Sequence, residues 1–289
     1  MLFLVIMVWL VLRDQNAKMN YIKLLTVSSI LFTNGMLFAQ DSITLNKDLP
    51  IVTNRPGFSE SAQAVYKGGF QIEAGLSYDK SPVTYDPSFS IHRLTVPNLG
   101  LLYGVSKNVE LRVFGNMYGT KYDKTIEDGY QFEFNDLSFG SKINLTTQKG
   151  WRPQLAILIN QGVPVKSADK TWDSKALLAW NYTITSKFGI AGNIWYDLKY
   201  NFDAVPSTWS QGYLGYTVSL NYNVTSEFGV FGEWYSEKKL VKDGEYTSIV
   251  DGGFWYLIHP KFQVDLQGGY GMSDENYFVT VGLSYLLLK

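Results

Sequence analysis

Few residues of this chain could act as a nucleophile, a general base or a metal ligand. Histidine occurs twice, at His92 near the start of an expected strand and at His259 beside Pro260 in an expected turn. The sequence contains no Gly-x-Ser-x-Gly elbow, no His-Glu-x-x-His pair, no phosphate-binding loop and no calcium-binding loop. It also contains no Cys, which excludes disulfides, Cys-ligated metals and a lipid anchor on Cys. We therefore predict no catalytic residues, no metal and no cofactor, and we interpret both histidines as structural or solvent-facing.

Charged residues on the polar side of alternating stretches form a larger group of candidates. A sheet would place them on one face, because successive side chains of a strand point to opposite sides. Eight of the twelve are acidic, which suits a polar channel with a mild preference for cations, or a site for a solute. The alternative, which we favour for most single residues, is a set of ion pairs that brace the wall, since an unpaired buried charge is costly. The twelve are Glu73, Glu110, Arg112, Asp136, Lys142, Lys175, Asp197, Lys199, Glu233, Glu237, Asp251 and Asp265.

The elements that must position these residues are strands. From residue 69 onward the hydrophobic period is two, and no window of similar length shows a helical stripe. Most stretches exceed the ~9–11 residues with which a tilted strand crosses a bilayer, whereas soluble strands more often have about 5–6 residues. Length therefore favours a transmembrane barrel over a soluble sandwich. We expect about twelve strands, near residues 69–79, 91–104, 108–118, 131–146, 152–163, 173–184, 188–199, 210–223, 228–239, 246–258, 261–272 and 276–288.

The connections between these stretches alternate between short and long. Outer-membrane barrels have short periplasmic turns and longer outer loops, and their sheet closes because lipid cannot satisfy an open edge. The short connections are 104–107, 146–151, 185–187, 224–227 and 259–260, and the long ones are 79–90, 119–130, 163–172, 200–210 and 238–245. We therefore predict an all-β fold, a closed antiparallel up-and-down transmembrane β-barrel with both chain ends on the periplasmic side.

Two details refine this expected wall. Pro97 lies inside an expected strand, where it removes a ladder donor and predicts a bulge or a bend. Four strand ends share one design, in which a Tyr is followed by a polar turn and an apolar strand start. These residues, Tyr103, Tyr182, Tyr222 and Tyr256, predict an aromatic girdle at the periplasmic interface. The alternative is ordinary Tyr at strand ends of a soluble meander.

Residues 1–39 have the layout of an export signal. Lys23 gives a basic start to an apolar centre, and Ala39 stands before Gln40, so we predict a signal peptide cleaved after Ala39. An N-terminal membrane anchor is the alternative, but neither apolar stretch reaches about 20 uninterrupted residues. Met19 is an alternative start of translation, because the stretch that follows it is a complete signal by itself.

Residues 40–68 form a segment of their own before the first expected strand. We predict that this segment lies in the periplasm and folds into the mouth of the barrel formed by residues 69–289. In this hypothesis Arg55 bonds lumenal carboxylates such as Glu73 or Glu110, and Arg55 and Glu60 are the charged residues of a plug. The alternative is a flexible lead-in that contacts nothing specific.

Composition limits the classes of partner. The chain of 289 residues has a net charge of -1, without the basic excess of a nucleic-acid-binding protein. Its hydrophobic content of 46% is too high for a disordered chain. We therefore expect no nucleic-acid partner.

Residues 53–75 and 96–112 carry a resemblance to a known family. They resemble outer-membrane barrels grouped under the meta pathway of phenol degradation, which in Bacteroidota-type bacteria are usually called transporters. The resemblance covers about residues 50–289, although Asn54 and Tyr66 stand where the pattern would have Asp and Pro. Its most specific parts are Arg55-Pro56, Glu60-Ser61, Lys67-Gly68, Glu73, Pro97-Asn98, Tyr103-Gly104 and Glu110-Leu111-Arg112. The resemblance implies a channel-like protein, without a defined substrate.

Together these features predict a barrel of the bacterial outer membrane that passes small solutes passively. Hydrophobic or aromatic solutes follow from the resemblance alone. The expected partners are outer-membrane lipid, an unidentified small solute and, during biogenesis, the barrel-assembly machinery. Two alternatives stay open, a barrel enzyme that acts on lipid and a non-conducting barrel with a structural or surface-interaction role.

Overall fold

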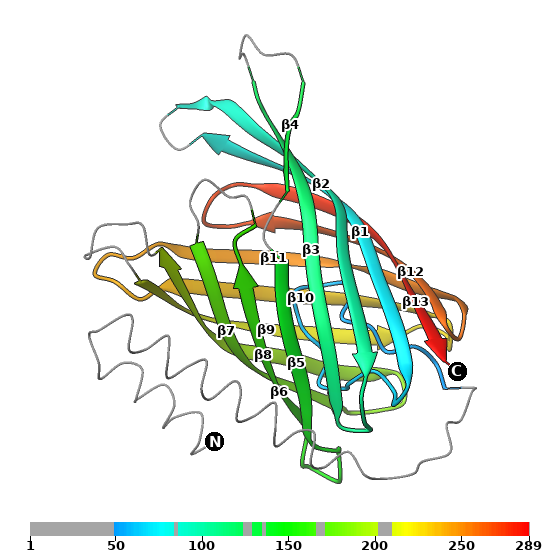
Figure 1. Ribbon diagram of the computed structural model, residues 1–289. Coiled ribbons are helices and arrows are strands. Elements are labelled where there is room, and N and C mark those ends of the chain that lie inside the picture. The colour runs from blue at the N-terminus through cyan, green and yellow to red at the C-terminus, as the bar shows by residue number, and fades with distance from the viewer. Residues whose placement is uncertain are drawn as a thin grey trace.

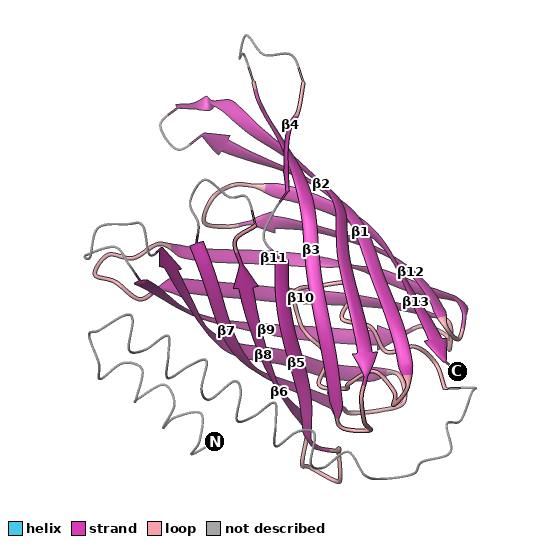
Figure 2. Ribbon diagram, viewed as in Figure 1, coloured by secondary structure: helices cyan, strands magenta, loops and turns pink. Residues whose placement is uncertain are grey.

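The structure is a computed structural model of the protein. It describes residues 49–83, 86–123, 129–134, 137–165, 171–201 and 210–288. The predicted signal peptide and Met19 lie outside the described residues. Among those described, no helix is long and apolar enough to span a membrane. The described elements are β1 (Gly69–Val83), β2 (Asp86–Gly104), β3 (Val109–Tyr122), β4 (Gln131–Phe134), β5 (Leu137–Thr146), β6 (Gln154–Val163), β7 (Thr171–Thr183), β8 (Phe188–Asn201), β9 (Ser210–Asn223), β10 (Phe228–Lys239), β11 (Tyr246–His259), β12 (Phe262–Gly271) and β13 (Tyr277–Leu288) (Figures 1 and 2).

These strands form one antiparallel sheet that closes on itself. From β5 to β13 consecutive strands pair with each other, and β1 pairs with both β13 and β2. The pairing of β2 with β3, and of β3 with β5, completes the ring. The barrel wall thus has twelve strands, and β4 is an addition that pairs with the outer end of β3. The predicted closed, antiparallel, twelve-stranded barrel is confirmed.

Two predicted boundaries are wrong on the side of the long connections. The expected strand 131–146 is two strands, β4 and β5, and the expected connection 79–90 is mostly strand, because β1 reaches Val83 and β2 begins at Asp86. Asp79 and Lys80, at the start of the expected connection, continue the β1–β2 ladder opposite Arg93 and His92. In Figure 1, β1, β2, β3 and β4 accordingly extend beyond the rest of the wall.

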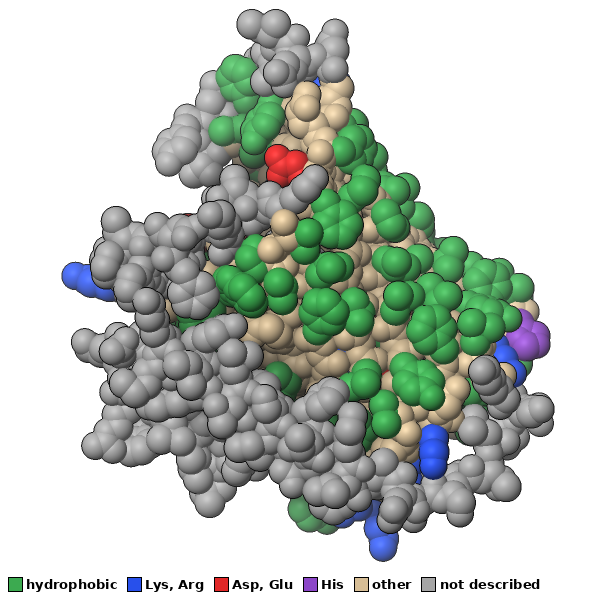
Figure 3. All heavy atoms as spheres, in the orientation of Figure 1, with side chains coloured by type: hydrophobic (Ala, Val, Ile, Leu, Met, Phe, Trp, Pro, Cys, Tyr) green, Lys and Arg blue, Asp and Glu red, His purple; other side chains and the backbone are tan. Residues whose placement is uncertain are grey.

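Strand parity separates two faces of the wall. On β9, Leu214, Val218 and Leu220 are exposed on the outer face, while Thr217 and Ser219 are buried inside the barrel. Apolar side chains cover the outer wall in Figure 3. The alternation therefore produces an apolar exterior and a more polar lumen, as in membrane barrels.

Pro97 causes the irregularity that the sequence predicts. The pairing of β2 with β3 shifts register between Thr95 and Asn98, and the pairing with β1 shifts between Gly75 and Ser77. A residue without an N–H cannot donate to the ladder, so the two strands bulge around it.

Candidate functional site

Residues 49–68, the lumenal segment, run inside the barrel at the end where β1 begins. Figure 1 draws them in blue within the ring of strands. Lumenal carboxylates accept hydrogen bonds from the backbone of this segment. Asn54 N donates to Glu73 Oε1 (3.0 Å), Val65 N donates to Glu110 Oε2 (2.9 Å), and Phe58 N and Ser59 N donate to Glu233 Oε1 (2.5 Å) and Oε2 (2.9 Å). Charged acceptors are strong partners for N–H groups, so these acids fix the path of the segment.

Side-chain amides of the wall complete this binding of the segment. They come from four further strands and accept from backbone N–H groups that would otherwise be unsatisfied inside the barrel. Asn144 accepts from Ala64 (3.1 Å), Asn181 from Ala62 (2.8 Å), Asn193 from Glu60 (2.7 Å) and Gln267 from Gly57 (3.3 Å). Sequence reasoning based on charge missed these residues, although they share strand parity with the predicted acids.

An ionic cluster of Glu60, Glu110, Arg112 and Lys142 joins the segment to β3 and β5. The guanidinium of Arg112 donates to both carboxylate oxygens of Glu60 (2.9 and 3.0 Å) and to Glu110 Oε1 (3.0 Å). Lys142 Nζ donates to Asn54 Oδ1 (2.8 Å) and lies 3.9 Å from Glu60. Burial disfavours the ionised form of Glu60, but Arg112 and Lys142 outweigh it, so the pKa of Glu60 is below its ordinary value of 4.5.

Arg55 lies in the lumen but binds another acid than the sequence suggested. The sequence suggested Glu73 or Glu110, whereas Arg55 Nη2 donates to Asp265 Oδ1 on β12 (3.2 Å). Glu73 and Glu110 are occupied by backbone N–H groups of the segment. Gly75 leaves room for the Arg55 side chain, because a Cβ at this position would stand 2.8 Å from the guanidinium. The lumenal side of β1 and β13 is thus hollowed to receive this side chain.

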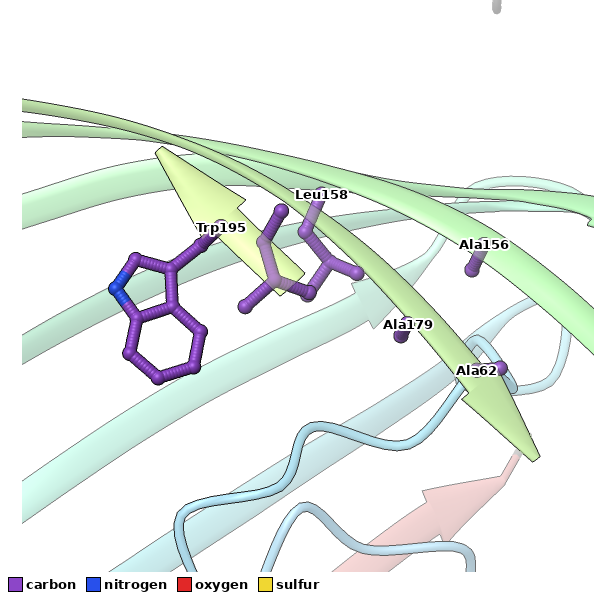
Figure 4. Packing of buried hydrophobic residues seen from close by; sticks show 6 residues of the cluster. Ala62, Ala156, Leu158, Ala179 and Trp195 are labelled. Atoms are coloured by element: carbon purple, nitrogen blue, oxygen red, sulfur yellow. The ribbon is translucent and has the colours of Figure 1, made fainter. Parts of the chain in front are cut away.

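Part of the lumen is apolar, which alternation did not predict. Ala62 of the segment packs with Ala156, Leu158, Leu177, Ala179 and Trp195, which come from β6, β7 and β8 (Figure 4). Phe58 lies against Tyr235, with ring centroids 4.9 Å apart. The stretch Leu155–Ile159 is apolar throughout, because its outer residues face lipid and its inner residues face the segment. These contacts anchor the segment on the side opposite Arg55.

Two cavities remain beside the segment, and both are lined by Glu60. The cavity on the side of the long connections, of about 490 Å³, is also lined by Phe114, Asn116, Asp173, Lys175 and Lys199. We call it the extracellular cavity, after the orientation that the sequence predicts. The cavity on the side of the short turns, which we call the periplasmic cavity after the same prediction, has a volume of about 460 Å³. It lies between the segment and the inner faces of β7 to β11, including Asn181, Ser219 and Asn221. Glu60 therefore stands at the boundary between the two spaces.

The other predicted lumenal residues lie on the inner face wherever the structure describes them. Asp251 accepts from Gln267 Nε2 (3.0 Å), and Glu237 accepts from Trp195 Nε1 (2.9 Å). Asp197 is buried. Lys175 Nζ lies 5.1 Å from the ring centre of Trp195, and Lys199 Nζ lies 4.6 Å from that of Tyr213. Asp136 lies outside the described residues.

Comparison with known proteins identifies the family. Residues 53–287 match the family described as "Putative MetA-pathway of phenol degradation". The chain belongs to this family. The resemblance carried by residues 53–75 and 96–112 is thereby confirmed. No curated protein sequence matches the chain.

Solved structures share the fold of this family member. An outer-membrane channel from Pseudomonas putida F1 has a TM-score of 0.62 at 13% identity, over 81% of this chain and 99% of that one. The translocator domain of the autotransporter NalP from Neisseria meningitidis has a TM-score of 0.50 at 12% identity, over 75% of this chain and 88% of that one. At such identities the likeness shows the fold, which is that of an outer-membrane β-barrel.

The four predicted girdle tyrosines of this family member lie at the strand ends beside the short turns. Tyr103, Tyr222 and Tyr256 are exposed, and Tyr182 is half-buried with its hydroxyl donating to Gly150 O (3.2 Å). Other aromatic residues lie near them, including Phe262, which packs edge-on against Tyr285. The arrangement suits the interface of a bilayer, where Tyr presents both an apolar ring and a polar tip.

The histidines of this family member lie away from the lumenal segment. His259 accepts from Lys261 N in the turn between β11 and β12 (3.2 Å). His92 lies in the part of β2 near the long connections, with Nδ1 2.7 Å from the Tyr78 hydroxyl and Nε2 2.9 Å from Asp123. Among the described residues, no group of three His, Asp or Glu side chains could hold a metal ion.

Proposed function

We propose that this protein is an outer-membrane channel that passes small solutes beside its own lumenal segment. The observation that carries the proposal is the position of Glu60, which lines both the extracellular and the periplasmic cavity. A solute that enters the outer cavity meets the segment at Glu60 and continues between the segment and β7 to β11. The segment narrows the lumen and thereby limits the size of the solute.

The lining of the cavities and the family together suggest the class of solute. Both cavities fall in the range of about 300–1,000 Å³ that is typical of small-molecule sites. The family description names phenol degradation, which points to small aromatic compounds with a polar group. The amide and hydroxyl groups of Asn181, Ser219 and Asn221 provide partners for such a hydroxyl, and Phe114 provides an apolar surface.

We further propose that the protein is not an enzyme and that it reaches the outer membrane by an N-terminal signal peptide. The alternative of a lipid-acting barrel enzyme would depend on His92, whose ring contacts Tyr78 and Asp123. Among the described contacts of His92 there is no serine hydroxyl to act as a nucleophile, so this geometry favours a structural role.

Conductance in planar bilayers tests the channel directly, with two substitutions on one strand. Asn221 lines the periplasmic cavity, whereas its neighbour Leu220 is exposed on the outer wall. We expect the refolded wild type to conduct, Asn221→Trp to conduct several-fold less, and Leu220→Trp to conduct like the wild type. Absence of conductance in the wild type would instead support the non-conducting barrel. Equal conductance of Asn221→Trp and wild type would place the solute path elsewhere.

A further inference from the structure

A row of basic residues crosses the outer face of three adjacent strands. Lys80 on β1 lies directly opposite His92 on β2, and His92 lies directly opposite Lys121 on β3. Neighbouring strands are about 4.8 Å apart, so the two lysine Cα atoms are separated by roughly 10 Å. The parity of β1 sets the direction of these side chains, since Lys80 pairs with Tyr277, which is exposed on the outer wall.

The row lies where the apolar band of the wall ends. Phe70 on β1 and Leu111 on β3 both lie directly opposite the girdle residue Tyr103 and mark its level. Lys80 is ten residues beyond Phe70, and Lys121 is ten residues beyond Leu111. Ten residues of a strand tilted by about 40° rise about 25 Å, which equals the height of the apolar band of a membrane barrel. The row is therefore at the level of the lipid headgroups on the side opposite the girdle.

The neighbours of the row also fit a lipid interface. Tyr277 continues the same row beside Lys80, and Tyr270 pairs with Tyr277 in turn; both tyrosines are exposed. Asp123 also lies on this surface, with its Oδ1 2.9 Å from His92 Nε2. Among the residues that the structure describes, neither Lys80 nor Lys121 has a carboxylate within 4.0 Å of its ammonium group, and Lys80 acts on Asp123 from a longer distance. Two ammonium groups thus flank a histidine whose Nε2 lies at hydrogen-bonding distance from the adjacent carboxylate.

We propose that Lys80, His92 and Lys121 bind the phosphorylated headgroup of a lipid in the outer leaflet. The position decides between a lipid and a free anion, because the apolar columns of β1 and β3 lead from the row along the wall and accommodate acyl chains. Lysine side chains from either side of His92 can reach one phosphate, and Tyr270 and Tyr277 provide a flanking aromatic surface. The proposal rests on the outer-membrane location and not on solute transport.

Titration of the refolded full-length protein with lipid A, followed by native mass spectrometry, tests this row. A lysine near an anionic lipid surface contributes about fivefold to affinity, so Lys80→Ala with Lys121→Ala should weaken binding about 25-fold. The matched control is Lys187→Ala with Lys261→Ala, which removes two lysines from periplasmic turns where the described bonds of both residues are made by the backbone. The control and Lys80→Arg with Lys121→Arg should bind like the wild type.

Three results would overturn the proposal. The first is equal affinity of the alanine pair and the wild type, and the second is equal affinity for lipid A from which the phosphates have been removed. The third is binding of inorganic phosphate alone as tightly as lipid A, which would assign the row to a free anion. Heat-modifiable gel mobility shows whether each variant is folded. Conductance should not differ between these variants, so a failure here is separate from a failure of the channel function.

Discussion

The two halves of the lumen use charged residues in different ways. In the periplasmic half, charged side chains of the wall have ionic partners at bonding distance. Arg112, for example, binds Glu60 of the lumenal segment and Glu110 of its own strand. In the extracellular half, Lys175 and Lys199 lie over aromatic rings and line an open cavity. The same alternation of polar residues therefore binds the lumenal segment at one end and lines an open polar cavity at the other.

Among the variants considered, removal of the Arg112 side chain should produce the largest loss of stability. Arg112→Ala leaves Glu60 and Glu110 without their guanidinium partner, and breaking a buried ion pair costs about 3–5 kcal/mol. We expect a lower free energy of unfolding by that amount, measured in detergent with guanidinium chloride, and a higher conductance because the segment loosens.

The matched control for Arg112 is an arginine of the extracellular half. Arg93 lies over the ring of Tyr118 at 5.5 Å. Arg93→Ala should therefore lower the free energy of unfolding by less than about 1 kcal/mol. Equal losses for the two variants would show that the halves do not differ in how they hold charge.

Two glutamates of β10 sharpen the comparison within one strand. Glu233 accepts from two backbone N–H groups of the segment, whereas Glu237 accepts from the indole of Trp195. Glu233→Gln replaces one oxygen by a donor and leaves one buried N–H unsatisfied, at a cost of about 1–3 kcal/mol. We expect Glu237→Gln to cost less than half of this in the same unfolding measurement. A larger loss for Glu237→Gln would contradict the fixed binding of the segment.

The sequence predicts the wall better than it predicts the contents of the barrel. Period-two alternation placed Glu73, Glu110 and Glu233 on one face, because strand parity is a local property. The partner of Arg55 could not be predicted, since Asp265 is 210 residues away and becomes a neighbour only through the closure of β1 on β13. The apolar part of the lumen was hidden because both faces of Leu155–Ile159 are apolar, one toward lipid and one toward Ala62.

Lysines of the extracellular cavity should affect selectivity and not stability. Lys175→Ala with Lys199→Ala removes two positive charges beside Asp173 and Glu60. Each substitution should lower the free energy of unfolding by less than about 1 kcal/mol, because neither ammonium has an ion-pair partner among the described residues. The reversal potential in a salt gradient should shift toward cations. If selectivity matches that of Lys187→Ala with Lys261→Ala, the extracellular cavity is not part of the solute path.

A crosslink between the segment and the wall tests whether the segment stays in place while solutes pass. We expect it to have the smallest effect, an unchanged conductance. Ala62 and Ala156 are fully buried in one cluster (Figure 4), and the chain has no Cys. A short reversible thiol crosslink in Ala62→Cys with Ala156→Cys would therefore tie the segment to β6 at a single known place. Since the periplasmic cavity lies between the segment and β7 to β11, we expect the same conductance before and after reduction of the crosslink. Ala62→Cys alone is the control. Loss of conductance that reduction restores would mean that the segment must leave the wall, and the periplasmic half would then be a gate instead of a fixed constriction.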